Sequence, residues 1–338
     1  MNEYHTFSGE TGSFEKLSLT EDEVGTISKL GLTPEDLSKL LDSQHFAEGS
    51  YALLFDIPDN DPRLVAKVWK NPKHDSDRAR NENVVLRLLK VRDFKNASKS
   101  KGYLKSSSIL FEEKIEGTPV EQFDKNVIEQ LAVALANLHS IKFNKYGKPL
   151  TERKRGTRMD YLLDGIENLQ KISKPFTDQT EAMGLINRSL DKIKDMAHKS
   201  NDVFSATNFT LIHFDLNKGN ILYSKKDGVP VIVDWEQASA GDNAMDIAKL
   251  FLKSNFDTDQ KQDFLRMYES CQENQDSHFQ ERLKVYEPFV LVNSIIWRLG
   301  VLRDMPRQMS SDNEGQFYSH VKFNFDKEIE MLKNFVSG

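Results

Sequence analysis

The sequence predicts an α+β protein of two lobes, with an antiparallel sheet in the N-terminal lobe and mostly helices in the C-terminal lobe. A chain of 338 residues is longer than one hydrophobic core usually supports, so a division is expected. Short apolar runs rich in Phe, Val, Leu and Tyr lie between turn residues near the start, and longer stretches with helical spacing follow. We therefore expect one lobe over residues 1–116 and the other over residues 117–338.

The N-terminal lobe is expected to begin with two short helices. Thr20 and Thr33 each precede a run with helical spacing and stand where a capping residue is favourable. Residues 45–58 and 63–70 then have the composition of strands, and "PDNDP" supplies the turn between them. A twisted antiparallel sheet is the expected result.

A helix and a further strand complete this lobe. Residues 77–90 place Val and Leu side chains on one helical face. The polar stretch 92–108 is typical of a loop. It leads into the apolar residues 109–117, which we expect to form a strand that ends at Gly117.

The C-terminal lobe is expected to be helical. Residues 127–141 are strongly periodic, and long amphipathic stretches follow over residues 159–199 and from residue 243 to the end. No internal repeat and no low-complexity tract interrupts them.

Composition limits the classes of function. A formal net charge of −6 argues against a protein that coats nucleic acid. No apolar run suggests a membrane span, and the first residues lack the pattern of a secretory signal. The single cysteine, Cys271, allows neither an intrachain disulfide nor a cysteine metal cluster, so we expect a cytoplasmic protein. The sequence leaves the oligomeric state open.

The strongest chemical signal is a hairpin with polar residues at its mouth. The apolar runs "ILYS" and "VPVIV" flank the turn signal "KKDG". Pairing them places Asn220 and Asp234 opposite or nearly opposite one another, roughly 4.5–5.5 Å apart at Cβ. An amide oxygen and a carboxylate with few other ligands suit Mg²⁺, which takes the rest of its shell from water and phosphates.

Asp215 lies on the loop that enters this hairpin. It stands five residues before Asn220, where it could accept a proton from a hydroxyl nucleophile. His213 lacks a second His or Cys partner nearby, so zinc fits poorly and the imidazole is more typical of a structural brace. Taken alone, the octapeptide "HFDLNKGN" could do no more than satisfy backbone hydrogen bonds. The hairpin, however, links it to the sequence Asp-Trp-Glu, which begins fourteen residues after Asn220.

Three ordered motifs then carry a resemblance. Residues 213–220 fit H-x-D-x-x-x-x-N, residues 234–236 are D-W-E, and residues 241–248 fit G-D-x-x-x-D-[LI]-A. The sequence resembles the aminoglycoside phosphotransferase and choline kinase superfamily, whose members share the bilobal protein-kinase-like fold.

The resemblance implies roles for particular residues. Asp215 would be the catalytic base, and Asn220 and Asp234 the magnesium ligands. Asp246 would be a brace at the start of the next helix, where a carboxylate favours exposed N–H groups and the positive end of the dipole. Phe214 departs from the glycine that the family has at that place.

The N-terminal lobe should hold the nucleotide, because phosphoryl transfer needs positive charge on the phosphates. "LVAKVWK" resembles the kinase V-A-I-K strand, which makes Lys67 the candidate for the α- and β-phosphates. Glu82, fifteen residues later, could pair with Lys67 and hold it in place. Lys70 is the alternative lysine.

Two backbone segments complete the expected nucleotide site. Gly49 and Ser50 could offer a backbone N–H and a hydroxyl to phosphate oxygens, although an ordinary turn between strands is the alternative. The backbone from Glu113 to Ile115 matches the hinge between the lobes and would bind a purine edge. The implied cofactors are ATP and Mg²⁺.

The acceptor is expected to be a small molecule with a hydroxyl group. An acidic protein suits a cationic acceptor, such as an aminoglycoside or an amino alcohol. The acidic candidates for contacting it are Asp160, Glu236, Asp242 and Glu269, and the aromatic candidates are Trp297 and Tyr268, with exposed charge and core packing as the alternatives. The chain ends in "EMLKNFVSG", whereas several aminoglycoside kinases end in an acidic-aromatic tail, so other acceptors stay open.

Two other functions compete with the small-molecule kinase. A protein kinase is disfavoured because the short gap from Asp234 to Asp246 leaves little room for an activation loop. A non-catalytic nucleotide-binding module on the same scaffold would not need Asp215 as a base.

Overall fold

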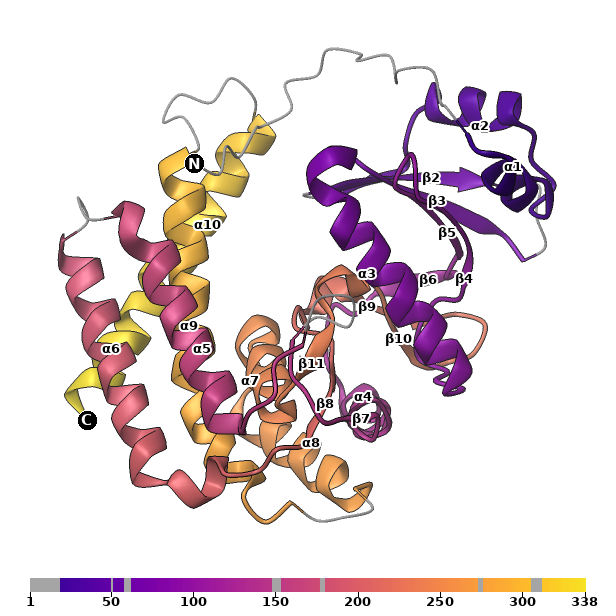
Figure 1. The fold of residues 1–338 in the computed structure, drawn as a ribbon. Helices are drawn as coiled ribbons and strands as arrows, with labels where there is room; N and C mark the ends of the chain where they lie inside the picture. The colour runs from indigo at the N-terminus through magenta and orange to yellow at the C-terminus, as the bar shows by residue number, and fades with distance from the viewer. Residues whose placement is uncertain are drawn as a thin grey trace.

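The N-terminal part of the structure is an antiparallel sheet of five strands in the order β1-β2-β3-β5-β4 (Figure 1). The computed structural model describes residues 19–49, 51–57, 62–147, 153–176, 180–272, 276–304 and 312–338. The elements of this part are α1 (Glu21–Ser28), α2 (Pro34–Leu41), β1 (Ala47–Glu48), β2 (Ala52–Ile57), β3 (Leu64–Trp69), α3 (Pro72–Val91), β4 (Ser100–Leu104) and β5 (Ile109–Glu113).

Helices cover both faces of this sheet. On β3, Ala66 and Val68 pack in one apolar cluster with Ile27 of α1 and Leu37 of α2. Because side chains alternate along a strand, Lys67 points to the opposite face, where α3 lies. The alternation of β3 therefore decides which of its residues can reach the rest of the molecule.

The predicted elements of this part are present, with three corrections. Both short helices begin with the predicted capping residues, Thr20 and Thr33. Helix α3 begins at Pro72 rather than at residue 77. The polar stretch 92–108 contains β4, an edge strand whose lysine and serine residues hide the apolar alternation of a half-buried strand.

The third correction concerns the strand expected to end at Gly117. Strand β5 ends at Glu113, and Gly117 begins β6 in a different sheet. A Cβ at Gly117 would lie 2.6 Å from the carbonyl oxygen of Tyr223, so only glycine allows this approach to β9. The proposed lobe boundary between residues 116 and 117 falls within the connection from β5 to β6.

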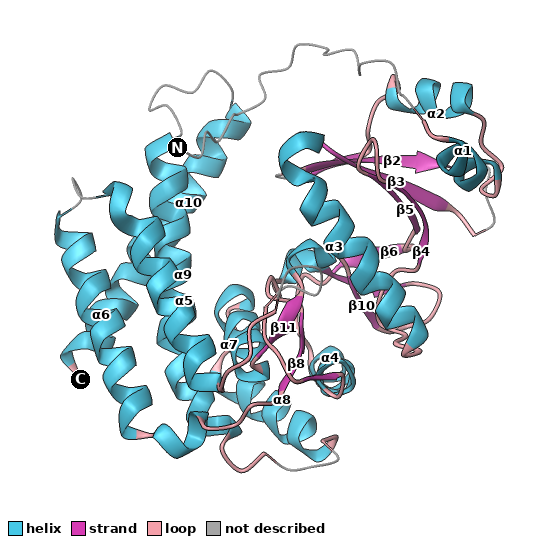
Figure 2. Cartoon of the chain, in the orientation of Figure 1, coloured by secondary structure: helices cyan, strands magenta, loops and turns pink. Residues whose placement is uncertain are grey.

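The C-terminal part combines two small antiparallel sheets with long helices (Figure 2). The sheets have the orders β10-β9-β6 and β11-β8-β7. The elements are β6 (Gly117–Pro119), α4 (Lys125–His139), β7 (Lys142–Phe143), α5 (Arg158–Ser173), η1 (Lys174–Phe176), α6 (Thr180–Lys199), η2 (Asn201–Phe204), β8 (Phe209–Ile212), η3 (Lys218–Asn220), β9 (Ile221–Ser224), β10 (Pro230–Ile232), η4 (Trp235–Gln237), β11 (Ser239–Gly241), α7 (Asn243–Ser254), α8 (Thr258–Ser270), α9 (Phe279–Asp304) and α10 (Asp312–Ser337).

Four of these helices, α5, α6, α9 and α10, pack side by side as a bundle next to α7 (Figures 1 and 2). Helix α9 is long and apolar enough to cross a membrane by length and composition, which the sequence analysis did not expect. Most of that apolar window is buried inside the protein, as in the core helix of a globular domain. Its apolar character is therefore weak evidence for a membrane span.

Candidate active site

The hairpin of β9 and β10 has the predicted register. Ile221 pairs with Ile232, and the Val233 N–H donates to the Asn220 carbonyl at 3.0 Å. Asn220 therefore lies opposite Val233, and Asp234 is the next residue along the opposite strand. The two predicted metal ligands are therefore near neighbours along the backbone at the mouth of the hairpin, one residue out of direct opposition.

Lys67 joins the two lobes at this point. Its Nζ lies 2.7 Å from Oε2 of Glu82 and 2.6 Å from Oδ1 of Asp234, which is 167 positions later in the chain. Asp234 has φ 66°, a left-handed conformation that aspartate tolerates better than most residues. The predicted pairing of Lys67 with Glu82 is confirmed.

Burial and charge act against each other in this cluster. Burial favours the neutral form of Lys67, but the carboxylates of Glu82 and Asp234 outweigh it and raise the pKa of Lys67. Burial raises the pKa of Glu82, opposed by Lys67. For Asp234 the attraction to Lys67 outweighs burial and lowers the pKa, so the Lys67–Asp234 pair stays charged at neutral pH.

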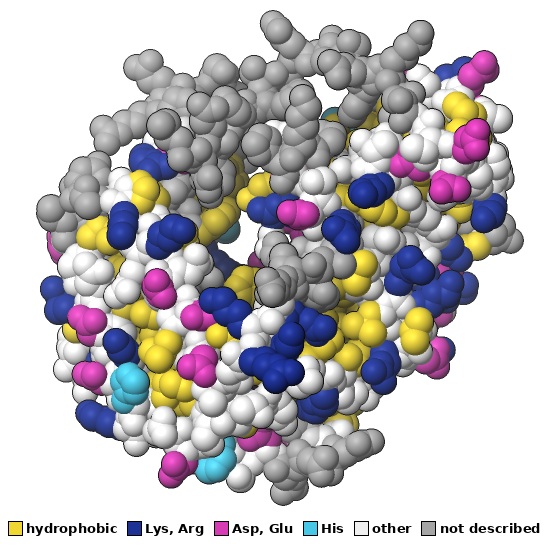
Figure 3. Space-filling model, in the orientation of Figure 1, with side chains coloured by type: hydrophobic (Ala, Val, Ile, Leu, Met, Phe, Trp, Pro, Cys, Tyr) yellow, Lys and Arg dark blue, Asp and Glu magenta, His cyan; other side chains and the backbone are white. Residues whose placement is uncertain are grey.

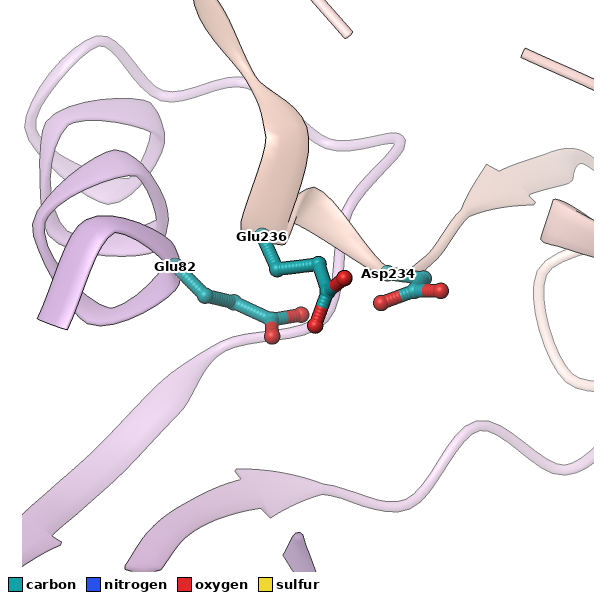
Figure 4. Close-up of side chains that lie close together, drawn as sticks. All are labelled: Glu82, Asp234 and Glu236. Carbon is teal, nitrogen blue, oxygen red and sulfur yellow. The ribbon is translucent and has the colours of Figure 1, made fainter. Parts of the chain in front are cut away.

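Three carboxylates, those of Glu82, Asp234 and Glu236, converge here (Figure 4). Glu82 is already occupied, because it also accepts from the Trp235 N–H at 2.9 Å. Glu236 accepts from Trp69 Nε1 at 3.2 Å and from Arg78 Nη1 at 2.8 Å. The Asp234 side chain, at 40% exposure, is the member of this group that remains accessible to a metal.

The side-chain amide of Asn220 is held by the loop that carries Asp215. Its Nδ2 donates to the Asp215 carbonyl at 2.9 Å and faces an Asp215 carboxylate oxygen at 3.4 Å. With the amide nitrogen engaged in this way, the Oδ1 of Asn220 is left as a ligand atom. An amide oxygen beside the Asp234 carboxylate fits a hard cation such as Mg²⁺.

Asp215, the predicted base, is 41% exposed and therefore accessible to a substrate. Lys249 Nζ of α7 lies 3.5 Å from Oδ1 of Asp215 and donates to the Phe214 carbonyl at 2.6 Å. Sequence reasoning missed Lys249, which comes directly after the third motif. A lysine one residue beyond Asp246-Ile247-Ala248 was the available signal.

Asp246 shapes the loop that carries Asp215. Its carboxylate accepts from the His213 N–H at 2.7 Å and from the Phe214 N–H at 2.8 Å. Asp246 also lies in the first turn of α7, as predicted, where its charge suits the positive end of the helix dipole, although Asp242 rather than Asp246 caps the helix. Phe214 has φ 66°, which explains why glycine suits this place in the family that the sequence resembles.

Two histidines stabilise the loop that carries Asp215, one directly and the other through Asp246. The His213 ring contacts the Val233 carbonyl through Nε2 at 2.9 Å and the Asp215 N–H through Nδ1 at 3.2 Å, as expected of a brace. His139, which sequence reasoning missed, lies between Asp246 and Tyr268. Its place at the end of the periodic run 127–141 offered little to distinguish it from a core residue.

The predicted nucleotide contacts have mixed outcomes. Gly49 follows β1 in the β1–β2 hairpin, and its N–H donates to the Ala52 carbonyl at 2.8 Å. The predicted offer of this N–H to a phosphate is therefore corrected in favour of the ordinary turn between strands, and Ser50 lies outside the described residues. The N–H groups of Glu113 and Lys114 donate to the carbonyls of Lys99 and Arg63, so neither N–H is free for a purine. The hinge prediction therefore needs correction at Glu113, where only the carbonyl remains a candidate, and Ile115 stays a prediction.

The predicted contacts to a cationic acceptor are not supported by the geometry. Each acidic candidate already accepts a hydrogen bond within the protein. Asp160 accepts from Thr157, and Asp242 accepts from Arg282. Glu236 accepts from Trp69 and Arg78, and Glu269 accepts from Gln280. Tyr268 is fully buried, which agrees with the alternative that it packs in the core. Trp297, in contrast, is 46% exposed.

Comparison with known sequences gives one family. The model of a phosphotransferase enzyme family matches residues 46–279, which include all the motifs described above. Among curated proteins, no sequence matches this one.

Comparison with solved structures identifies the fold. A choline kinase from Cryptosporidium parvum has 17% identity and a TM-score of 0.58, covering 86% of this chain and 89% of its own. A Plasmodium vivax ethanolamine kinase has 16% identity and a TM-score of 0.56, covering 86% of each chain. The GDP and kanamycin complex of APH(2")-IIia has 15% identity and a TM-score of 0.56, covering 86% and 91%. The predicted α+β, bilobal, protein-kinase-like fold is confirmed.

Proposed function

The chain belongs to the phosphotransferase enzyme family, and on that premise we propose that it is a kinase that transfers the γ-phosphate of ATP to a hydroxyl of a small molecule. The observation that carries the proposal is the cluster in which Lys67 lies between Glu82 and Asp234, with Asn220 beside it. Similar folds are found in enzymes described as choline and ethanolamine kinases and in a complex with GDP and kanamycin.

Lys67 is the proposed contact of the nucleotide phosphates. It is nearly buried and charged, and it projects from the sheet toward the hairpin of the other lobe. Glu82 fixes its position, so little reorganisation is needed when phosphate binds. Positioned charge of this kind supplies much of the catalysis in phosphoryl transfer.

Asn220 and Asp234 are the proposed ligands of Mg²⁺. These residues would hold the ion where its positive charge would offset the negative charge of the phosphates during transfer. The pKa of Asp234 is lowered by Lys67, so its carboxylate is ready to bind metal at neutral pH.

Asp215 is the proposed base. The acceptor oxygen attacks the γ-phosphorus, the bond from that phosphorus to the bridging oxygen breaks, ADP leaves, and Asp215 takes the hydroxyl proton. Asn220 and Lys249 hold the Asp215 backbone and carboxylate in place.

The structure argues against an activation loop of the protein-kinase type. The residues between Asp234 and Asp246 form η4, β11 and the start of α7, so this short segment is already folded. This supports a small-molecule acceptor over a protein acceptor.

The test is ADP release in the presence of Mg²⁺, ATP and panels of amino alcohols, aminoglycosides, sugars and hydroxy acids. We expect Asp215→Asn to lower the rate of transfer about a hundredfold or more, because the base is lost. Asp326→Asn, which removes an exposed carboxylate on α10, should leave the rate unchanged. Stabilisation by ATP without transfer to any acceptor would instead favour a non-catalytic module.

A further inference from the structure

The wall of α7 beside Asp215 carries two lysines. Lys249 and Lys253 are four residues apart, so they lie on one face of the helix. Lys249 contacts the carboxylate of Asp215 and the carbonyl of Phe214. Lys253 lies one turn further along, facing α9 and α10.

Lys253 has a neutral partner. Its Nζ donates to the hydroxyl of Ser294, and the ring of Trp297 lies 5.9 Å away. Within the described part of the chain, no carboxylate forms an ion pair with it. Burial is the main cause that lowers its pKa to about 8. Glu328 and Asp215 favour its charged form, whereas Arg298 and Lys249 disfavour it.

Glu328, the acid bonded to Ser294, cannot serve a cationic substrate. Glu328 of α10 accepts from Arg298 at 2.9 and 3.1 Å and from the Ser294 hydroxyl at 2.9 Å. Its side chain is 7% exposed, so both oxygens are held within the protein. The group next to Lys253 is thus a closed Arg298–Glu328 pair.

The two lysine charges beside the base therefore disfavour an amine acceptor. A cation beside Lys249 and Lys253 would be repelled, and the exposed Trp297 already lies near Lys253 and Arg298. Figure 3 shows the face between the lobes hollowed, with Lys and Arg side chains gathered at its edge. An anion bound beside Lys253 would supply the counter-charge that Lys253 lacks.

We propose that the acceptor is a hydroxylated anion whose carboxylate or phosphate binds Lys253, beside Lys249 and Trp297, while its hydroxyl faces Asp215. This inference rests on the function proposed above and deepens it by naming the class of substrate. It replaces the cationic acceptor that the acidic composition suggested. Net charge is a property of the whole surface, whereas substrate charge is chosen by the few groups at the site.

The experiment uses probes that share one hydroxylated three-carbon framework and differ in charge. Glycerate, glycerol 3-phosphate, glycerol and 3-amino-1,2-propanediol are each titrated by calorimetry into the full chain, saturated with Mg²⁺ and a non-hydrolysable ATP analogue. ADP release from ATP is measured with the same four compounds. We expect the anions to bind at least about tenfold more tightly than glycerol, and the amine to bind most weakly. The comparison of glycerate with glycerol 3-phosphate shows which anionic group is preferred.

Substitutions of Lys253 test whether this residue causes the preference for anions. Lys253→Met keeps the length and apolar stem of the side chain, and should weaken anion binding about tenfold to a hundredfold. Lys253→Arg keeps the charge and should retain most of the preference. Lys322→Met, which removes an exposed lysine of α10, is the matched control and should bind anions as the unaltered protein does.

The outcomes separate this inference from the proposed function. Four results would each overturn the anionic acceptor. They are equal binding of all four probes, tighter binding of the amine, absence of anion binding, and an anion preference that survives in Lys253→Met. Transfer of phosphate to the hydroxyl of an amino alcohol or a neutral alcohol would also overturn the anionic acceptor, but it would support the proposed kinase activity. Anion binding through Lys253 without transfer to any hydroxyl would count against the kinase and not against the anion site.

Discussion

Lys253 illustrates how a single residue can serve binding at a cost to stability. Its ammonium is largely removed from water, its partner is the uncharged Ser294, and Arg298 and Lys249 lie nearby. The free protein should therefore be less stable than one with an apolar side chain at this position.

This gives a prediction at the residue scale. At pH 7 we expect Lys253→Met to raise the free energy of unfolding by about 1 kcal/mol, because a desolvated charge is removed. Chemical denaturation of both proteins measures it. A variant that is less stable than the unaltered protein by a similar amount would show that the Ser294 contact outweighs desolvation.

The same group predicts a dependence on pH. The folded-state pKa of about 8 lies below the unfolded value, so the unfolded chain binds more protons between the two and stability rises with pH through this window. Lys253→Met should lose that rise above pH 8. Denaturation midpoints of both proteins across pH 7 to 10 measure the difference, with Lys322→Met as the control. Parallel curves for all three proteins would contradict the assignment.

At the scale of elements, the hairpin β9–β10 depends on its contact with β6. Gly117 pairs with Ser224 across this edge, and the Val120 N–H donates to the Ile221 carbonyl. The closeness of β6 to the hairpin leaves no room for a side chain at Gly117. The strand that carries Asn220 at its start is thus supported by the segment that connects the two lobes.

We predict that Gly117→Ala destabilises the protein by about 1–3 kcal/mol, because its Cβ would meet backbone rather than a flexible side chain. Gly25→Ala is the matched control. Gly25 lies in α1 with open space around it, so alanine there should stabilise by about 0.5–1 kcal/mol. Thermal or chemical unfolding of both variants measures the contrast, and equal effects would show that the β6 contact is adaptable.

At the scale of the whole molecule, Glu82 couples the lobes. One oxygen binds Lys67 of the sheet, and the other accepts from the Trp235 N–H of the C-terminal part. Asn81, its neighbour on α3, donates to the carbonyls of Glu236 and Ala238. Helix α3 therefore transmits the position of the hairpin to the sheet that is proposed to hold the nucleotide.

Glu82→Gln should weaken this coupling. We expect the KM for ATP to rise about tenfold and the free energy of unfolding to fall by about 1–3 kcal/mol, because Lys67 loses a buried charged partner. Steady-state kinetics and chemical denaturation measure both. Glu116→Gln, which alters an exposed pair with Arg63, should change neither. An unchanged KM would remove Glu82 from the proposed nucleotide site.

The sequence by itself determined the parts of the site that depend on local pairing. The turn "KKDG" and the two apolar runs fix the register that places Asn220 opposite Val233, one residue before Asp234, because a two-strand hairpin leaves few alternatives. The capping residues Thr20 and Thr33 likewise fix where α1 and α2 begin. The pairing of Lys67 with Glu82 was predictable from resemblance, but its geometry was not.

Only the tertiary structure decided which charges meet at the acceptor wall. Lys253, Ser294 and Glu328 lie on three different helices, and nothing in their spacing along the chain predicts that they touch. Likewise, the acidic candidates for the acceptor are held by partners that are distant in the sequence or on other turns, and Asp246, in the first turn of α7, accepts from the loop before β9. The physical reason is that such contacts depend on how helices pack after the chain has folded, whereas hairpins and caps are set by residues only a few positions apart.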